Sequence, residues 1–449
     1  MGRLFGTDGV RGVANRELTS TLAYEIGKAA ALVLSNESKK PKFLIGMDTR
    51  LSGCMLENAL TAGILSVGGT AVKLGILPTP AIAMLVKHYG ADAGVVISAS
   101  HNSFEYNGIK IFNSDGYKLD DSTEEKIEDI ILAHEYHGPE FIGADIGRIE
   151  IVDDGLDIYT SFLIDTFDGN KLDGVKVVLD TANGASYETA KEVYEKLGAN
   201  IVVINDNPNG ININDNCGST HPEALQKKVV EVGADMGFAF DGDADRLIVV
   251  DELGRILDGD VVMCVCAKML KNSGELYDNK LTATVMSNIG LHKHLEECGI
   301  AVDVTKVGDR YVLESMIETG SVIGGEQSGH MIFKNYTTTG DGVLSSLQFI
   351  KAVMASGKKV SDLRDEVKIY PQSLVNVKIR NEYKKTVLDS EEVISSIKKV
   401  EEKIGDTGRV LIRPSGTEPL IRVMIEGENE AEIEKYAKDI AGVIERKFS

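Results

Sequence analysis

The chain has 449 residues and a formal net charge of −21 at pH 7, with 43% hydrophobic and 26% charged residues. This is the composition of a folded globular protein, and its length predicts three domains, or four if one is small. Such an acidic balance argues against nucleic acid and anionic membranes as partners, because both bind basic surfaces. Any anionic ligand must therefore meet locally concentrated arginine and lysine.

The amino-terminal residues and the cysteines favour a cytoplasmic location. Met1 to Gly6 lacks the apolar core of a signal peptide, and no segment approaches the length of a membrane span. The five cysteines are odd in number and include no C-x-x-C pair, which argues against a disulfide framework and a zinc ribbon. Cys264 and Cys266 lie in an apolar run, so we interpret them as small buried side chains.

Three stretches of the chain show the alternation of an apolar strand with an amphipathic helix that is typical of α/β units. Each unit also contains a strand that runs into a polar turn, which would fit a degenerate internal repeat. The expected strands and helices are residues 43–47, 52–67 and 70–74, then 175–180 with a helix to 197, then 281–286 with a helix to 298. The polar turns are at residues 48–50, 180–184 and 241–243.

After Tyr370 and Pro371, the order of expected strands and helices changes to one that is typical of a small α+β domain. Its expected elements are strand 374–379, helix 390–404, strands 409–413 and 420–426, and a helix to the end. We place domain boundaries near Asp153, Glu252 and Ile369, where acidic or proline-containing turns interrupt the apolar periodicity. The predicted fold is therefore three α/β domains, of mixed sheets flanked by helices, and a smaller C-terminal α+β domain. Their predicted ranges are 1–153, 154–252, 253–369 and 370–449.

The apolar residues 95–97 end abruptly in Ser98, Ala99, Ser100, His101 and Asn102. We interpret this as a buried strand that delivers a serine into a loop at its carboxyl end, where open α/β sheets place their chemistry. Ser100 is the candidate nucleophile. A plain turn remains the alternative at this point, because serine and asparagine are common turn residues.

The strongest local signal is Asp241, Asp243 and Asp245, which alternate with glycine and alanine. In an extended segment, alternate side chains share a face, so the three carboxylates would point the same way and repel one another unless a cation joins them. Mg²⁺ is the expected ion, since it takes oxygen ligands and completes its shell with water and phosphate. A solvated acidic turn is the weaker alternative.

Two other motifs resemble this aspartate run. A calcium EF-hand would need glycine where Arg246 stands and helices where the flanking residues predict strands, so it is excluded. A phosphatase motif of the D-x-D-x-T type would make Asp241 a nucleophile, but its fifth position here is Asp245. The phosphatase survives as a minor alternative.

Further polar residues come from five other places in the chain. Arg11 lies in a glycine-rich loop and suits a phosphate, while Lys110 follows a turn and could return to the serine loop or remain on the surface. Two loops follow strand-like runs, one with Arg310 and one with glycines, and the second suits hydrogen bonds to sugar hydroxyls, with a structural turn as the alternative. The second of these contains Glu326, Ser328 and His330. A nest for phosphate is predicted around Arg413, Ser415, Gly416, Thr417 and Arg422.

In this order, the motifs resemble the α-D-phosphohexomutases along the whole chain. The resemblance implies three related α/β domains and a smaller fourth domain around a central cleft. It implies that Ser100 is a phosphoserine, that a phosphoserine oxygen joins the three aspartates around one Mg²⁺, and that Arg11, His101, Lys110 and Arg246 lie beside it. It also implies sugar recognition by Glu326 and Ser328, and phosphate binding by the arginine loop of the C-terminal domain.

The implied reaction transfers a phosphoryl group from Ser100 to a hexose monophosphate and back from a bound 1,6-bisphosphate, which also serves as the activator that phosphorylates Ser100. Either Lys110 or His101 would move the proton. By resemblance alone, Gln327 and residues 308–310 favour glucosamine phosphates, with glucose or mannose phosphates as the alternative substrates. A metal-dependent sugar phosphatase and a non-catalytic sugar-phosphate clamp are the rivals from other classes. The expected partner is a small-molecule hexosamine phosphate, and a homodimer is one candidate assembly.

Overall fold

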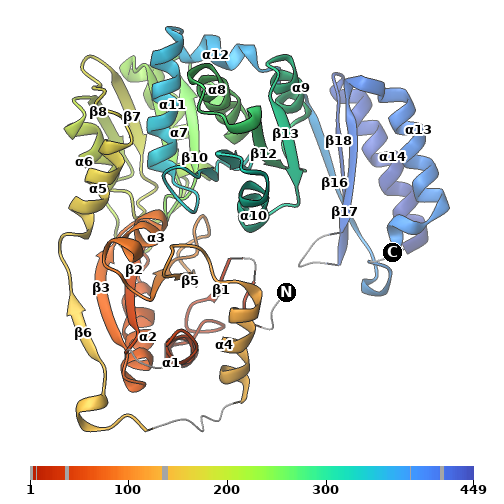
Figure 1. The fold of residues 1–449 in the computed structure, drawn as a ribbon. Coiled ribbons are helices and arrows are strands. Elements are labelled where there is room, and N and C mark those ends of the chain that lie inside the picture. The colour runs from red at the N-terminus through yellow and green to blue at the C-terminus, as the bar shows by residue number, and fades with distance from the viewer. Residues whose placement is uncertain are drawn as a thin grey trace. The chain divides into compact units, whose positions relative to one another are not determined.

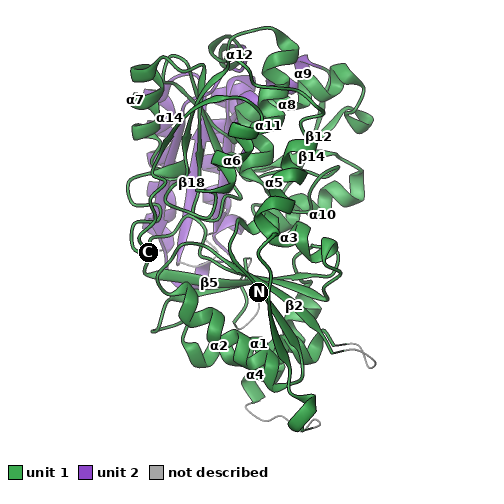
Figure 2. Cartoon of the chain, turned by 90° about the vertical axis from the view of Figure 1, so that its left-hand side faces the viewer, with its two compact units in different colours: residues 1–286, 299–365 green, residues 287–298, 366–449 purple. Residues whose placement is uncertain are grey.

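The computed structural model describes residues 4–6, 8–35, 40–133, 140–384, 386–414 and 419–448. They form three sheets with flanking helices and a smaller antiparallel sheet, as the sequence predicts (Figure 1). By their contacts the residues divide into two compact units, one of residues 1–286 and 299–365 and the other of residues 287–298 and 366–449 (Figure 2). The domain boundaries proposed from the sequence stay a prediction. Among the described residues, no helix has the length and apolar composition needed to cross a membrane.

The first sheet has the strand order β1-β5-β4-β2-β3-β6 and contains the strand predicted before the serine. Its strands are β1 (Val10–Val13), β2 (Lys42–Met47), β3 (Thr70–Ile76), β4 (Ala93–Ile97), β5 (Tyr106–Asn113) and β6 (Arg148–Ile151). Its helices are α1 (Ser20–Val33), α2 (Gly53–Ser66), α3 (Thr79–His88) and α4 (Asp121–Ala133).

Side-chain alternation along β2 and β4 places helices on both faces of this sheet. Ile45 and Val95 belong to the core that includes α1, α2 and α4. On the other face, Gly46 and Gly94 allow α3 to approach, because a Cβ there would lie 2.4 Å from Ile82 and 2.5 Å from Val86 of that helix. α3 is therefore held close against the two strands whose carboxyl ends carry the polar loops described below.

The second sheet has the order β11-β10-β9-β7-β8. Its strands are β7 (Lys176–Asp180), β8 (Asn200–Ile204), β9 (Met236–Phe240), β10 (Leu247–Asp251) and β11 (Ile256–Leu257), and the helices near it in the chain are α5 (Gly155–Asp165), α6 (Thr189–Lys196) and α7 (Glu223–Val232). α7 packs through Leu225 and Val229 on one face. On the other, Phe238 contacts the rings of Tyr194 and Phe349.

The third sheet has the order β13-β12-β14-β15. Its strands are β12 (Lys280–Thr284), β13 (Ala301–Thr305), β14 (Ile323–Gly325) and β15 (Met331–Phe333), and its part of the chain adds α8 (Gly259–Ser273), α10 (Asp309–Thr319), α11 (Gly342–Ser356) and α12 (Val360–Glu366). Asp258 and Asp341 begin α8 and α11 by accepting hydrogen bonds from the backbone N–H of Val261 and Leu344. Cys264 and Cys266 lie fully buried in α8, as predicted.

The smaller antiparallel sheet has the order β16-β18-β17, and its core includes residues of two long helices. These elements are β16 (Gln372–Lys378), β17 (Arg409–Pro414), β18 (Leu420–Glu426), α13 (Glu391–Ile404) and α14 (Glu430–Phe448). The same compact unit contains α9 (Ile289–Glu297), although that helix lies between β12 and β13 in the sequence. Glu426 accepts a hydrogen bond from the first backbone N–H of α9, and Asn288 exchanges hydrogen bonds with the backbone of Tyr370.

The close contact of α1 with α2 allows a direct test of the packing. A Cβ at Gly63 would lie 2.1 Å from the Tyr24 carbonyl oxygen, so Gly63→Ala must push the two helices apart. We expect a loss of about 1–3 kcal/mol of stability, measured as a lower thermal unfolding midpoint. Gly442→Ala in α14 is the control, because its Cβ would come no closer than 3.4 Å to the end of the Arg446 side chain. Equal midpoints for the two variants would contradict this account.

Candidate active site

Ser100 lies in the loop that follows β4, as the sequence predicts. Its side chain is buried, at 1% exposure, and its backbone has the unusual φ of 51°. The Ser100 N–H donates a hydrogen bond of 2.9 Å to the Ser98 hydroxyl, so the turn is stabilised by its own side chains. A non-glycine residue in this left-handed region needs support from its surroundings.

Much of that support comes from Arg50, which follows the neighbouring strand β2. Its guanidinium group is fully buried and donates 2.8 Å hydrogen bonds to the carbonyl oxygens of Ser100 and Asn102. Asp48 holds the Nε of Arg50 at 2.8 Å. Further hydrogen bonds from Arg50 reach the carbonyl oxygens of Ser103 and Tyr106. The shape of the serine loop is therefore fixed from a second strand of the same sheet.

The three aspartates lie in the turn between β9 and β10, and their carboxylate oxygens come within 4.8 Å of one another. The expectation of an extended segment was wrong in its geometry, because residues 241–245 form a turn in which Ala244 has a φ of 57°. The predicted convergence of Asp241, Asp243 and Asp245 is nevertheless found. It arises from the turn, and not from strand alternation.

The turn meets the serine loop directly. The Ser100 hydroxyl donates a hydrogen bond of 2.6 Å to Oδ2 of Asp241, while the backbone N–H of Arg246 donates to Oδ1 of the same carboxylate. Oδ2 of Asp243 accepts from Lys110 Nζ at 2.8 Å and from Thr79 Oγ1 at 2.6 Å. Residues from two sheets thus converge on one buried cluster.

The donor set fits a divalent cation. Oδ1 of Asp243 and Oδ1 of Asp245 are buried and accept no hydrogen bond from any residue that the structure describes. Burial, and then the charges of Asp245 and Asp243, raise the pKa of Asp241 well above its usual value. A hard cation would supply the missing partners and offset the repulsion between the carboxylates.

Lys110 is buried beside this cluster, which excludes the alternative of a solvated surface lysine. Only 1% of its side chain is exposed, and Nζ lies 3.1 Å from Asp8 and 3.5 Å from Asp245. Burial lowers the pKa of Lys110, but the carboxylates of Asp243, Asp8 and Asp245 outweigh it and raise this pKa well above its usual value. Lys110 is thus held as a cation among acids.

The other basic residues expected near the serine lie around the same cluster. Burial, and then the positive charges of Arg246 and Arg11, lower the pKa of His101 to about 4. Arg11 forms an ion pair of 2.5 Å with Asp8, which also binds Lys110. Arg246 Nε lies 3.8 Å from Asp245 and 3.9 Å from Asp241, and it is buried with no hydrogen-bond partner among the described residues.

The predicted sugar loop connects β14 to β15 and docks against β10. The backbone N–H of Leu247 donates to the Gly329 carbonyl at 3.0 Å, and Oε1 of Glu326 accepts from the Gly308 N–H at 3.0 Å. Ser328 is exposed and His330 is buried, so the two candidates differ in access. Gln327, thought to favour glucosamine, donates to Asp258 at the start of α8 at 3.1 Å.

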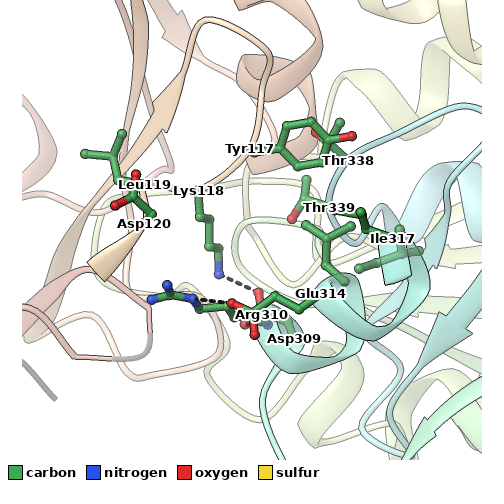
Figure 3. Close-up of a pocket in the computed structure, with 12 residues that line it drawn as sticks. Tyr117, Lys118, Leu119, Asp120, Asp309, Arg310, Glu314, Ile317, Thr338 and Thr339 are labelled. Atoms are coloured by element: carbon green, nitrogen blue, oxygen red, sulfur yellow. Dashed lines mark hydrogen bonds and ion pairs between the residues drawn. The ribbon is translucent and has the colours of Figure 1, made fainter. Parts of the chain in front are cut away.

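Arg310 lies at the edge of a hollow of about 180 Å³ lined by residues after β5 and by α10 (Figure 3). Its guanidinium group forms ion pairs with Asp121 and Glu314. The neighbouring Asp309 pairs with Lys118, which also binds Asp8. In this arrangement Arg310 is already paired with two carboxylates, so it would have to break these ion pairs to bind a sugar phosphate.

The C-terminal unit holds Arg413 and Arg422 directly opposite each other on β17 and β18. Nε of Arg422 is buried without a hydrogen-bond partner among the described residues. Three other candidates for the phosphate loop, Ser415, Gly416 and Thr417, lie outside the residues that the structure describes.

Sequence reasoning did not identify Arg50, Thr79, Asn214 and Asp8 as parts of the cluster. Asn214 donates to the carbonyl oxygens of Ser100 and Asn102 at 2.9 and 3.0 Å. Arg50 carried one usable signal, since its polar turn follows a predicted strand. Asp8 pairs with the nearby Arg11, but its contact with Lys110 is distant in the sequence, as are the contacts of Thr79 and Asn214.

Four models of one protein family match the chain in order. They describe phosphoglucomutase/phosphomannomutase alpha/beta/alpha domains I, II and III at residues 2–137, 157–254 and 258–370, and the C-terminal domain at residues 374–443.

Among curated proteins, the chain is 55% identical over 447 residues to a phosphoglucosamine mutase of Clostridium tetani, and 56% identical over 450 residues to one of Caldicellulosiruptor bescii. Both matches cover 100% of each chain.

Solved structures agree in fold. A phosphoglucomutase/phosphomannomutase family protein of Burkholderia thailandensis aligns with a TM-score of 0.80 at 24% identity, over 99% of this chain and 97% of the other. An Aspergillus fumigatus N-acetylphosphoglucosamine mutase, in complex with GlcNAc-6P and magnesium, aligns with a TM-score of 0.69 at 17% identity, over 99% and 96% of the two chains. The family models and the full-length relatives together establish that the chain belongs to the phosphoglucomutase/phosphomannomutase family of α-D-phosphohexomutases.

Proposed function

We propose that this protein is a phosphoglucosamine mutase that interconverts glucosamine 6-phosphate and glucosamine 1-phosphate, for the synthesis of amino-sugar nucleotides. The observation that carries the mechanism is the buried Ser100 hydroxyl, 2.6 Å from Asp241 in a cluster of three carboxylates. The specificity for glucosamine is supported by curated relatives of that name that match the whole chain. The five free thiols fit a reducing compartment, and we propose the cytoplasm.

Ser100 would carry the phosphoryl group. It would donate this group to the free hydroxyl of a hexosamine monophosphate, and the resulting 1,6-bisphosphate would return its other phosphoryl group to Ser100 after turning over. The buried loop, held by Arg50 and Asn214, keeps the serine oxygen in one place for both transfers. Lys110 and His101 are the two candidates for moving the proton of the attacking hydroxyl.

Asp241, Asp243 and Asp245 would hold one Mg²⁺ together with an oxygen of the phosphorylated Ser100. When bound, this ion offsets the negative charge that develops during phosphoryl transfer. Arg246 and Lys110 already lie beside the carboxylates and add fixed positive charge there. Arg11 approaches from the amino-terminal loop, where its planar group suits a phosphate oxygen pair.

Glu326, Ser328 and His330 would recognise the sugar hydroxyls, with Arg310 from the neighbouring loop. For the C-terminal unit we propose phosphate binding by Arg413 and Arg422, together with the loop of Ser415, Gly416 and Thr417. The opposite positions of the two arginines on adjacent strands, and the buried Nε of Arg422 without a hydrogen-bond partner among the described residues, support this role, because guanidinium groups bind phosphate oxygens in pairs.

Replacing the serine tests the proposal most directly. We expect Ser100→Ala to abolish mutase turnover and to lower the thermal midpoint only slightly, because it removes one hydroxyl and its hydrogen bond to Asp241. Intact-mass measurement of the wild type, treated with glucose 1,6-bisphosphate, should show one added phosphate that peptide mapping places on Ser100. Phosphate mapped to Asp241 would support the phosphatase instead.

The sugar loop can be tested without disturbing the cluster. Ser328→Ala should lower kcat/KM for every hexose phosphate by about 5- to 100-fold, the loss of one or more hydrogen bonds worth about 1–3 kcal/mol. Ser356→Ala, at the end of α11, is the control and should match the wild type in kinetics, since its exposed hydroxyl makes only local backbone hydrogen bonds, to the Val353 carbonyl and from the Lys358 N–H. Unchanged kinetics for Ser328→Ala would move sugar recognition to other residues.

Substrate choice needs its own measurement. We expect kcat/KM to be highest for glucosamine 6-phosphate when it is compared with glucose and mannose 6-phosphates under the same conditions. A higher value for glucose or mannose would replace the proposed activity by that of a phosphoglucomutase or phosphomannomutase. Net release of inorganic phosphate at the rate of substrate loss would instead identify a phosphatase.

A further inference from the structure

Thr79 links the first α/β domain to the aspartate turn of the second. It is the first residue of α3, and it is fully buried. Its hydroxyl donates a 2.6 Å hydrogen bond to Oδ2 of Asp243, and its backbone N–H donates a 3.0 Å hydrogen bond to the Asp243 carbonyl oxygen. Thr79 therefore holds both the side chain and the backbone of this one aspartate.

The position of Thr79 is itself well determined. Pro78 and Pro80 flank it and restrict the backbone at the start of the helix. α3 is packed against β2 and β4 through Ile82 and Val86, which occupy the space left by Gly46 and Gly94. A hydroxyl mounted in this way can hold a carboxylate in one orientation.

The two oxygens of the Asp243 carboxylate have different surroundings. Oδ2 accepts two hydrogen bonds, one from Thr79 and one from Lys110 Nζ at 2.8 Å. Oδ1 is buried and has no hydrogen-bond partner within the described part of the chain. An oxygen that already accepts two hydrogen bonds has no lone pair left for a metal, so only Oδ1 is available.

We propose that Thr79 is a positioning residue that makes Asp243 a one-oxygen ligand and thereby favours Mg²⁺ over Ca²⁺ at the aspartate turn. Mg²⁺ requires a compact octahedral shell, to which a carboxylate contributes one oxygen, whereas Ca²⁺ accepts more ligands and readily takes both oxygens of a carboxylate. By occupying Oδ2, Thr79 and Lys110 oppose the two-oxygen mode. The inference rests on the proposed metal site, but its selectivity claim goes beyond it.

The test measures metal binding and not turnover. Mg²⁺ and Ca²⁺ are titrated separately by calorimetry into the full-length unphosphorylated protein, for the wild type, Thr79→Val and Thr79→Ser. Thr79→Val keeps the shape of the side chain and removes its hydroxyl, so we expect Mg²⁺ affinity to fall about 10- to 100-fold, as for other residues that orient metal ligands. Ca²⁺ affinity should fall much less or rise, and Thr79→Ser should keep the selectivity of the wild type.

Thr160→Val is the matched control, because Thr160 is also fully buried and its hydroxyl has no hydrogen-bond partner among the described residues. It should leave the affinities for both ions unchanged. Thr79→Ala provides a second way to remove the hydroxyl if Thr79→Val does not fold.

Four results would overturn the proposal. If Thr79→Val lost equal affinity for Mg²⁺ and Ca²⁺, Thr79 would have only a structural role. If Thr79→Ser behaved like Thr79→Val, the hydroxyl group would not be the cause of the selectivity. A wild type that binds neither ion would overturn the metal site together with this inference. Binding by the wild type with unchanged selectivity in Thr79→Val would overturn the inference alone.

Discussion

The burial of three like charges in one turn is the constraint on which the rest of this site depends. Asp241, Asp243 and Asp245 are at most 5% exposed, and buried charges of one sign must be compensated or neutralised. Lys110 supplies part of this compensation from the first sheet, and Arg246 supplies another part from the turn itself. The first and second sheets are thus joined through electrostatics at the point where the Ser100 hydroxyl also arrives.

Preorganisation of the serine loop is the second property that matters for chemistry. Ser100 has a left-handed backbone, and its carbonyl oxygen is held by Arg50 and Asn214 from two other segments. Strain at a reactive residue persists only when surrounding contacts hold it. In the proposed cycle Ser100 gives up one phosphoryl group and takes back another, so both transfers need a serine oxygen that does not move, and these backbone contacts would serve the reaction without touching the substrate.

Much of this arrangement follows from local sequence. The strand before Ser100, the return of Lys110 along β5 and the aspartate run could be predicted, because each depends on periodicity or on neighbouring residues. The shape of the aspartate turn could not, since the left-handed Ala244 gives no pattern in the sequence. Arg50 and Thr79 also escaped notice, because polar residues after a strand or at a helix start usually have local roles. Only the tertiary fold reveals their partners.

The compact unit that contains the C-terminal sheet also has a consequence for the order in which the protein is made. α9 emerges from the ribosome before β13, yet Ile289 at its start donates a hydrogen bond to Glu426 of β18, which is translated 137 residues later. Asn288, just before α9, likewise cannot form its hydrogen bonds with the backbone of Tyr370 until that residue has been translated. During synthesis, the amino-terminal end of α9 therefore lacks this native partner until β18 has emerged from the ribosome. This unit can complete its folding only after β18 has left the exit tunnel, whereas the first sheet can form as soon as β6 has left it.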